Sequence, residues 1–297
     1  MSEGIQKAAG KKLRQILGTM TRNRFFGVLT GFVITGLVQS SSATTVMTVS
    51  FVNAGLISLL QSAGVMMGAN IGTTVTGWLV SYLGFKFKIS AIAIPIMAFA
   101  LPMIFFRKAS IKAWGEFLMG FALLFLGLAA LKDSVPDLSE SPELLQFLSA
   151  YANPSLLSRL MFVGVGALLT IIIQSSSAAM TLTFVMTANG WIPFEVAASM
   201  ILGENIGTTI TAELASMVGN VHAKRSARIH SLFNIIGVSW MVFLVPYVLP
   251  WITWFSVDVM GNASPYSDVT DAPEAIPLAL SYFHSFFNLV NMFLLIG

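Results

Sequence analysis

Long apolar stretches recur along this chain and are separated by short polar segments. Four of them, at 89–106, 114–131, 229–250 and 276–297, are long enough to cross about 30 Å of hydrocarbon as an α-helix. One secretory signal could not account for four such segments. Because an isolated spanning segment must satisfy its backbone internally, the pattern predicts an all-α membrane protein.

A polar signature interrupts this apolar pattern twice. The sequence Q-S-S-S-A at 39–43 returns at 174–178, and G-A-N-I-G-T-T-V-T at 68–76 returns as G-E-N-I-G-T-T-I-T at 203–211. Both returns come 135 positions later, and each copy carries an Asn and a Gly between its two motifs. Since Asn and Gly favour turns, each copy is expected to form a helical hairpin.

The Q-S-S-S motifs lie between apolar flanks, so they are expected at membrane depth. Non-helical backbone persists there only where protein, water or a ligand satisfies it. We therefore expect a re-entrant hairpin and a discontinuous helix in each copy.

The distribution of charge predicts the topology. Basic residues precede the first apolar segment and gather again at 107–112 and 224–228, whereas acidic residues gather at 133–143. By the positive-inside rule the N-terminus is cytoplasmic and the two copies run in opposite directions, as inverted-topology repeats do. This predicts about six full crossings, organised as a basic cytoplasmic segment at 1–24, a first transmembrane repeat unit at 25–131, an external loop at 132–154 and a second, inverted unit at 155–297.

The amino-acid composition mainly excludes classes of protein and of site. Charged residues make up 10% of the chain, against about 25% in soluble domains, and no cysteine is present. Disulfides, thiolate metal sites and cysteine nucleophiles are thereby excluded. The net charge of +3 and the basic N-terminal segment fit anionic lipid headgroups better than nucleic acid. We expect an integral protein of the plasma (inner) membrane.

The duplicated motifs offer ligands for ions of both signs. Half-helix N-termini and hydroxyl donors suit an anion, which makes the first candidate set Ser40, Ser41, Ser42, Ser175, Ser176, Ser177, Asn70 and Asn205. Neutral oxygens suit sodium, which makes the second set Gln39, Gln174, Thr73, Thr74, Thr208 and Thr209. The alternative is that these small residues only pack helices against one another. Helix packing, however, does not require Gln and Asn at the same spacing in two copies.

Two further residues are candidates for a coupling or pH role. Glu204 replaces Ala69 of the first copy, and an ionisable group at this depth is a functional candidate. It could equally shape the site through a hydrogen bond alone. His230 could titrate near neutral pH or serve as a structural histidine. His222 and His230 have no third ligand nearby, so no zinc site and no cofactor is expected, and sodium is the only predicted metal.

Together these residues resemble the type II sodium/phosphate cotransporter family. The resemblance covers about 31–81 and 164–216, and the family's R-x-A-x-x-H-x-x-F-N element matches 225–234, with a related H-S-F-F-N at 284–288. It implies inorganic phosphate as substrate, sodium as coupling ion, the Q-S-S-S turns as the phosphate site, and secondary active import by alternating access. The first repeat is not followed by the H-D-x-F-N element of animal members, which leaves the sodium-to-phosphate ratio and the electrical sign of transport open.

Other functions remain as alternatives to this one. The same residues could carry another oxyanion such as sulfate or arsenate, or line a passive anion channel. An intramembrane serine hydrolase is the weakest candidate, because a nucleophile is normally unique whereas the serines here are duplicated, so we predict that the chain is not an enzyme. The sequence leaves open a homo-oligomer and a PhoU-like regulatory domain beyond Gly297, which some bacterial members of the family carry.

Overall fold

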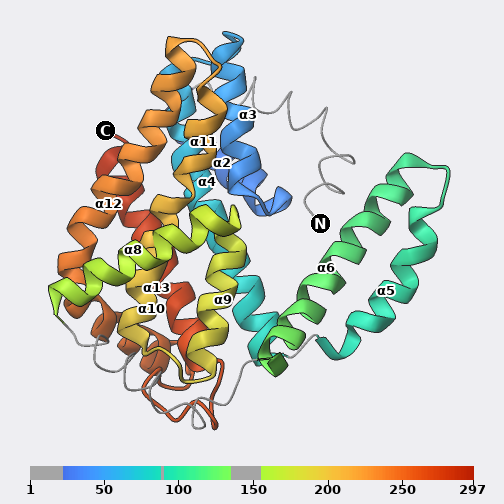
Figure 1. The fold of residues 1–297 in the computed structure, drawn as a ribbon, viewed down its shortest axis with the longest axis vertical. Coiled ribbons are helices and arrows are strands. Elements are labelled where there is room, and N and C mark those ends of the chain that lie inside the picture. The colour runs from blue at the N-terminus through green and yellow to red at the C-terminus, as the bar shows by residue number, and fades with distance from the viewer. Residues whose placement is uncertain (1–22, 88–89, 135–154) are drawn as a thin grey trace.

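Every regular element in the computed structural model, which describes residues 23–87, 90–134 and 155–297, is a helix. This confirms the predicted all-α class, and the four predicted apolar segments are present as α5, α6, α12 and α13. In chain order the elements are α2 (Arg24–Val38), α3 (Ser41–Asn53), α4 (Leu59–Leu79), the π-helix η1 (Val80–Lys86), α5 (Ser90–Ile104), α6 (Ala109–Ser134), α8 (Leu156–Ile173), α9 (Ser176–Ala188), α10 (Phe194–Gly207), α11 (Thr209–Ser216), α12 (Val221–Trp254), the π-helix η3 (Phe255–Val259) and α13 (Ala275–Leu295) (Figure 1).

Two three-helix units, α2–α3–α4 and α8–α9–α10, pack internally in the same way. A Cβ atom on Gly68 would lie 1.9 Å from the carbonyl oxygen of Val28, and one on Gly203 would lie 1.9 Å from that of Val163. Corresponding residues of the two contacts are 135 positions apart. The same correspondence holds for the close approaches at Gly31 and Gly166 and at Gly72 and Gly207. Only glycine allows backbones this close, so the repeat in sequence is also a repeat in packing.

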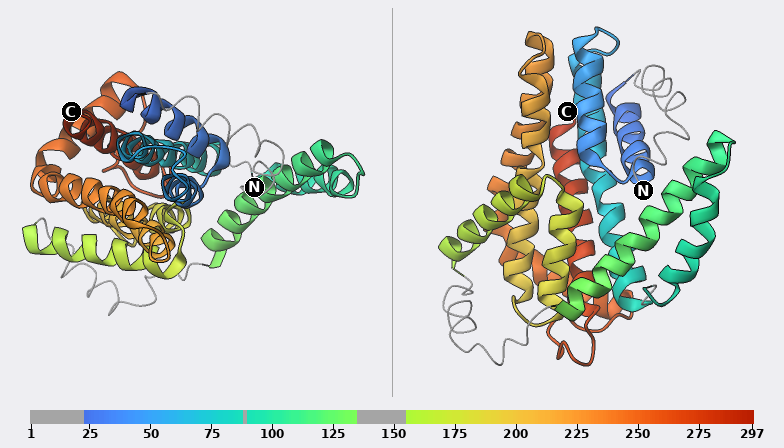
Figure 2. Two further views of the ribbon diagram at one scale, coloured as in Figure 1. Left: turned by 90° about the horizontal axis from the view of Figure 1, so that it is seen from above. Right: turned by 45° about the vertical axis from the view of Figure 1, so that its right-hand side comes forward.

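The two units point in opposite directions. The turn between α3 and α4 lies at the top of Figure 1 and the turn between α9 and α10 near the bottom, and the right-hand view of Figure 2 agrees. Helices α3 and α9 have 13 residues each, about 20 Å, which is less than the hydrocarbon thickness of about 30 Å. Neither helix is therefore long enough by itself to cross the hydrocarbon.

Fewer helices qualify as full membrane spans than the sequence predicted. By length and composition, four helices of the described residues can cross a bilayer, or five if the pair formed by Leu59–Lys86 and Ala91–Ile104, bent by 118°, counts as one span. Length and composition do not fix how the shorter apolar helices lie in the bilayer, so about six full crossings stays a prediction. Helix α4 and the α10–α11 pair contain the polar N-I-G-T-T motifs, and α10 and α11 are separate helices that meet at Thr208.

The main hydrophobic core joins the second unit to the two C-terminal helices. It includes Phe184 of α9, Met200 of α10, Met241 of α12 and Phe283 of α13, all at most 2% exposed. The α5–α6 pair projects from this body (Figure 2), and α6 reaches the core through Phe125 and Leu128.

Some of the predicted boundaries can be compared with the structure. Helix α6 continues to Ser134 and so enters the expected external loop at 132–154. The rest of that loop, and all but the last two residues of the expected cytoplasmic segment 1–24, lie outside the described residues.

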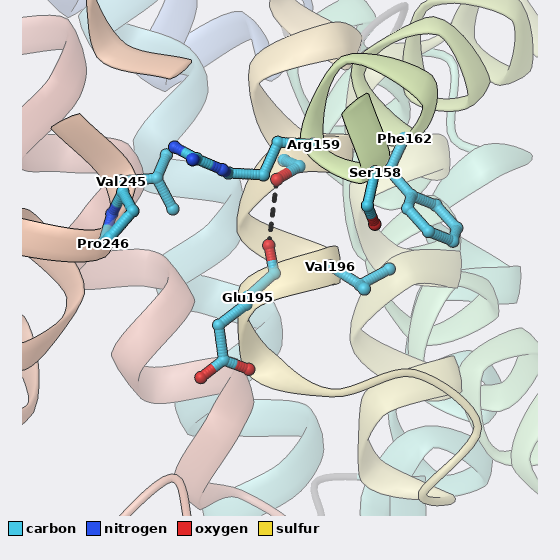
Figure 3. A pocket seen from close by; sticks show the side chains of 8 residues that line it. Ser158, Arg159, Phe162, Glu195, Val196, Val245 and Pro246 are labelled. Carbon is cyan, nitrogen blue, oxygen red and sulfur yellow. Dashed lines mark hydrogen bonds between the residues drawn. The ribbon is translucent and has the colours of Figure 1, made fainter. Parts of the chain in front are cut away.

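A charged side chain in α8 compensates a gap in the hydrogen bonding of α12. Pro246 has no N–H, so the carbonyl oxygen of Val242 lacks its helical donor. Arg159 Nη1 donates a hydrogen bond to that oxygen. Figure 3 shows the guanidinium group directed toward Val245 and Pro246, in a pocket also lined by Glu195. The Arg159 side chain thereby links α8 to α12.

Candidate functional site

Each unit breaks its helix at the glutamine of the Q-S-S-S motif. Gln39 ends α2 with a φ of 57°, and Gln174 ends α8 with a φ of 60°. Their backbone N–H groups donate to Thr35 and Thr170, respectively. A left-handed conformation costs a residue with a Cβ atom about 1–2 kcal/mol. The same unfavourable conformation occurs in both copies, as is typical of functional sites.

The serines after each glutamine start the next helix. The Oγ atoms of Ser40 and Ser175 accept hydrogen bonds of 3.2 Å from the backbone N–H groups of the residues three positions on. Ser41 and Ser176 are the first helical residues and are 5% and 7% exposed. The positive end of each of the α3 and α9 dipoles therefore lies beside a buried serine hydroxyl group.

Thr76 connects the motifs of the two units. Its Oγ1 donates to Gln39 Oε1 at 2.9 Å, and Ser177 Oγ donates to Thr76 Oγ1 at 3.4 Å. Thr76 is 4% exposed, so this contact is shielded from solvent. Gln174 has different partners: its side chain is exposed and donates to the carbonyl of Ile171 at 3.3 Å. Both Q-S-S-S motifs thus meet at Thr76 of the first N-I-G-T-T-V-T segment, whereas Gln174 of the second motif takes no part in the contact.

The four threonines predicted to hold sodium donate to backbone oxygens about one turn earlier in the chain. Their hydroxyl groups bond backbone oxygens three or four residues earlier; the residues are Thr73, Thr74, Thr208 and Thr209. This local bonding matches the packing alternative. It also leaves lone pairs on each oxygen, which is what a cation requires.

The two asparagines differ between the copies. Both are buried, at 2% for Asn70 and 3% for Asn205. Asn70 Nδ2 donates to the carbonyl of Met66 at 3.1 Å, whereas Asn205 Oδ1 lies 3.2 Å from Nε2 of His284. Asn205 Nδ2 is buried and has no hydrogen-bond partner among the described residues. It is therefore a donor that remains for an anion or a water molecule.

Glu204 and His230 are both buried but have different surroundings. Glu204 is 3% exposed, and its Oε1 accepts a 2.7 Å hydrogen bond from Thr183 Oγ1, which links α10 to α9 of the same unit. His230, on α12, is 1% exposed, and its Nδ1 has no partner among the described residues.

A second duplicated element emerges from α12 and α13. Asn234 Nδ2 donates to the carbonyl of His230, and Asn288 Nδ2 to that of His284, both at 3.0 Å. The Oδ1 atoms of both asparagines are buried and without partners in the described part of the chain. Our candidate set omitted Asn234, Asn288, His284 and Thr76. The two H-x-x-F-N segments and the repeated V/I-T at the end of the second motif were the signals that could have revealed them.

A sodium site built of neutral oxygens fits these residues better than a carboxylate or imidazole cage. No group of three or more His, Cys, Asp or Glu residues that could hold a metal occurs in 23–87, 90–134 and 155–297. The buried amide and hydroxyl oxygens described above are hard, uncharged ligands of the kind preferred by hard cations.

Comparison with known families decides the assignment. A family model described as Na+/Pi-cotransporter matches residues 1–133 and 144–256. The chain belongs to this family. The predicted resemblance is thereby confirmed, and the protein is a member of a transporter family with an all-helical membrane architecture.

Individual relatives of this cotransporter family member carry different names. The "Putative inorganic phosphate export protein YjbB" of Escherichia coli K12 is 28% identical over 291 residues, which are 97% of this chain and 48% of the relative. The chain thus spans about half the length of that protein. "Uncharacterized protein YqeW" of Bacillus subtilis is 26% identical over 295 residues, covering 98% of this chain and 92% of the relative. The "Sodium-dependent phosphate transport protein 2A" of Ovis aries is 36% identical over 85 residues, 28% of this chain and 13% of the relative. No solved structure matches the chain.

Proposed function

We propose that this protein imports inorganic phosphate together with sodium by alternating access, with the two Q-S-S-S motifs forming one central site. The observation that carries the proposal is the buried contact of Thr76 with Gln39 of the first motif and Ser177 of the second. Because the motifs come from units of opposite direction, a ligand between them can be reached from either side when the units tilt. Membership of the cotransporter family supports the same function.

In the proposed site, hydrogen-bond donors would hold the anion and oxygen lone pairs would hold the cation. The α3 and α9 starts and the serine hydroxyls, with Asn70 and Asn205, would bind phosphate through hydrogen-bond donation. Gln39, Gln174 and the four threonines would bind sodium through oxygen lone pairs. The unpartnered Oδ1 atoms of Asn234 and Asn288 extend this second set. A cation beside the anion lowers the cost of desolvating both, which is the physical basis of coupling.

The direction of transport has a second candidate. The name of the E. coli relative contains the words phosphate export. A symporter follows the combined gradients of its substrates, so import is expected where sodium is higher outside. An exporter of the same fold would instead release phosphate without an inward sodium gradient.

We place the protein in the plasma (inner) membrane with the N-terminus in the cytoplasm.

Phosphate flux in proteoliposomes tests the proposal. Labelled phosphate uptake is measured with sodium, potassium or choline outside, with unlabelled sulfate and arsenate as competitors, and efflux is measured from loaded vesicles under the same salts. Sodium-dependent accumulation against a phosphate gradient is the expected result. Equal uptake in the three salts would reject sodium coupling and favour a channel, and efflux that ignores sodium would favour export.

Two variants test the site within this assay. Ser41→Ala and Ser176→Ala each remove one buried hydroxyl at corresponding positions, and protein amounts in the vesicles are matched. Uptake should fall in both. Unchanged uptake in both would reject the central site, whereas a loss in one alone would reject its symmetry.

A further inference from the structure

A cavity of about 360 Å³ opens between α11 and α12, away from the Q-S-S-S motifs. Glu213, Leu214 and Met217 of α11 line one side, and Lys224 and Arg228 of α12 line the other. With two cationic side chains and one carboxylate, the cavity carries an excess of positive charge.

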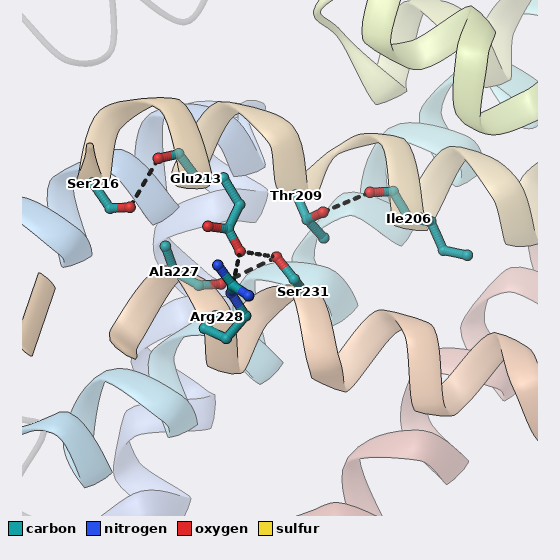
Figure 4. Close-up of polar contacts among 7 residues, drawn as sticks. All are labelled: Ile206, Thr209, Glu213, Ser216, Ala227, Arg228 and Ser231. Carbon is teal, nitrogen blue, oxygen red and sulfur yellow. Dashed lines mark hydrogen bonds and ion pairs between the residues drawn. The ribbon is translucent and has the colours of Figure 1, made fainter. Parts of the chain in front are cut away.

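The carboxylate of Glu213 engages only some of the N–H donors of Arg228. Glu213 Oε1 accepts a hydrogen bond of 2.6 Å from Ser231 Oγ and forms an ion pair of 3.2 Å with Arg228 Nε (Figure 4). A guanidinium group has five N–H donors, so Arg228 keeps its terminal amino groups for a second anion. The Arg228 side chain is 70% exposed and can reorient toward a ligand.

The position of the cavity indicates contact with the membrane surface. Helix α12 has 34 residues and is about 51 Å long, whereas the hydrocarbon core is about 30 Å thick. The apolar run of this helix begins at residue 229, so its first two turns, which contain Lys224 and Arg228, extend to the level of the headgroups. Leu214 and Met217, which line the cavity, have exposed apolar side chains, and so do Val218 and Val221, which follow them in the chain.

We propose that this cavity binds an anionic phospholipid. The lipid phosphate contacts Lys224 and Arg228, and an acyl chain covers Leu214 and Met217. Basic pockets between membrane helices attract anionic headgroups, and each nearby cation contributes about fivefold in affinity. A free phosphate ion would interact with the same cations, but it would leave the adjoining apolar side chains uncovered.

Lipid binding to the purified full chain in detergent tests the assignment. Native mass spectrometry counts bound palmitoyl-oleoyl-phosphatidylglycerol, and phosphatidylcholine with the same acyl chains is the lipid control. Lys224→Gln and Arg228→Gln should each weaken phosphatidylglycerol binding about fivefold. Arg225→Gln is the matched protein control. Arg225 is exposed on the same helix but does not line the cavity, so this substitution removes the same charge from outside the cavity. It should leave binding unchanged.

The substitution Glu213→Gln should change phosphatidylglycerol binding in the opposite direction. Because Glu213 competes for Arg228, its neutralisation should tighten phosphatidylglycerol binding, and a thermal melt confirms that each variant is folded. Equal binding of the two lipids, or equal loss in the Arg225 control, would overturn the proposal. If inorganic phosphate displaces phosphatidylglycerol with the same dependence on Lys224 and Arg228, the lipid assignment is wrong and the cavity is a site for free anions.

Discussion

Thr76 is the residue on which contact between the two motifs depends. Its hydroxyl group is both a donor to Gln39 and an acceptor from Ser177, so it satisfies one polar group from each unit. A buried acceptor left without its donor costs about 1–3 kcal/mol. The arrangement around Gln39 is therefore sensitive to this one hydroxyl group.

Replacing Thr76 by valine should lower phosphate uptake strongly. Valine keeps the shape of threonine but removes the hydroxyl group, and the 1–3 kcal/mol penalty corresponds to about 5–150-fold. Initial uptake rates in vesicles of matched protein content measure the effect. Thr76→Ser should restore most of the activity because it restores the hydroxyl group.

The corresponding residue of the second unit provides the control. Thr211 donates to the carbonyl of Thr208, one turn back in the chain, at 3.0 Å. Thr211→Val should thus have a much smaller effect. If both valine variants behaved alike, the contact between the motifs would not be the cause.

Glu204→Gln should preserve the fold but raise the sodium concentration needed for uptake. The amide oxygen of glutamine can still accept the hydrogen bond from Thr183, while the ionisable group is lost. The sodium dependence of uptake measures this, with a thermal melt for stability. Glu204→Ala, which copies Ala69 of the first unit, should lose the contact with Thr183 as well. An unchanged sodium dependence in Glu204→Gln would give Glu204 a purely structural role.

Duplication made the candidate site residues visible in the sequence, whereas the contacts between them were not predictable. The serines, the threonines and Asn70 and Asn205 stand out because each recurs after 135 positions. The bond between Ser177 and Thr76 joins residues 101 positions apart, and no local pattern predicts it. The left-handed conformation of Gln39 and Gln174 was also unpredictable, because glutamine has no local preference for it.

At the scale of helices, the close packing within each unit rests on glycine. Gly203→Ala should destabilise the protein by about 1–3 kcal/mol or more, since the new Cβ atom would meet the carbonyl oxygen of Val163 at 1.9 Å. Gly164→Ala on the adjoining face of α8 is the control, because no heavy atom lies within 4 Å of its Cβ position. That variant should be neutral or about 0.5–1 kcal/mol more stable. Thermal unfolding in detergent compares the two, and equal effects would contradict the packing argument.

The contact between α8 and α12 predicts that a second substitution can offset the loss of stability caused by the first. Arg159→Met should destabilise the protein by about 1–3 kcal/mol, because the carbonyl oxygen of Val242 would be left without a donor. Pro246→Ala returns a backbone N–H to α12, so it should recover much of this loss when the two are combined. A double-mutant cycle of thermal unfolding measures the coupling between the residues. Additive effects would show that the guanidinium group does not replace the missing helical donor.

The elements themselves were largely predictable, because apolar length and polar interruption are local properties of a sequence. The apolar segments 114–131 and 229–250 became the longer helices α6 and α12. The number of crossings was not predictable in the same way. It depends on whether α4 and α10–α11, with polar motifs in their interiors, count as spans, and that depends on which neighbours cover the motifs.

At the scale of the whole molecule, the two units share their packing but differ at the site. Gln39 is half-buried and bonded to Thr76, whereas Gln174 is exposed. Thr35 donates to Thr44 at 3.0 Å, but the corresponding Thr170 hydroxyl is unpartnered among the described residues, because alanine stands at position 179. Units related by an inverted repeat can exchange such environments, and that exchange is alternating access. Under the proposed alternating access, the structure would be one of two states.

Cysteine labelling can detect the exchange, since the natural chain has no cysteine. Ala43 and Ala178 follow the serines of the two motifs; Ala43 packs against apolar neighbours, and Ala178 is exposed. Maleimides react with thiols that reach water, so Ala178→Cys should react faster than Ala43→Cys in the absence of ligand. Sodium and phosphate together should change the two rates in opposite directions, because closing one side opens the other. Equal protection of both would instead indicate a site that closes around its ligand without exchanging sides, and sodium or phosphate acting alone would separate binding from coupling.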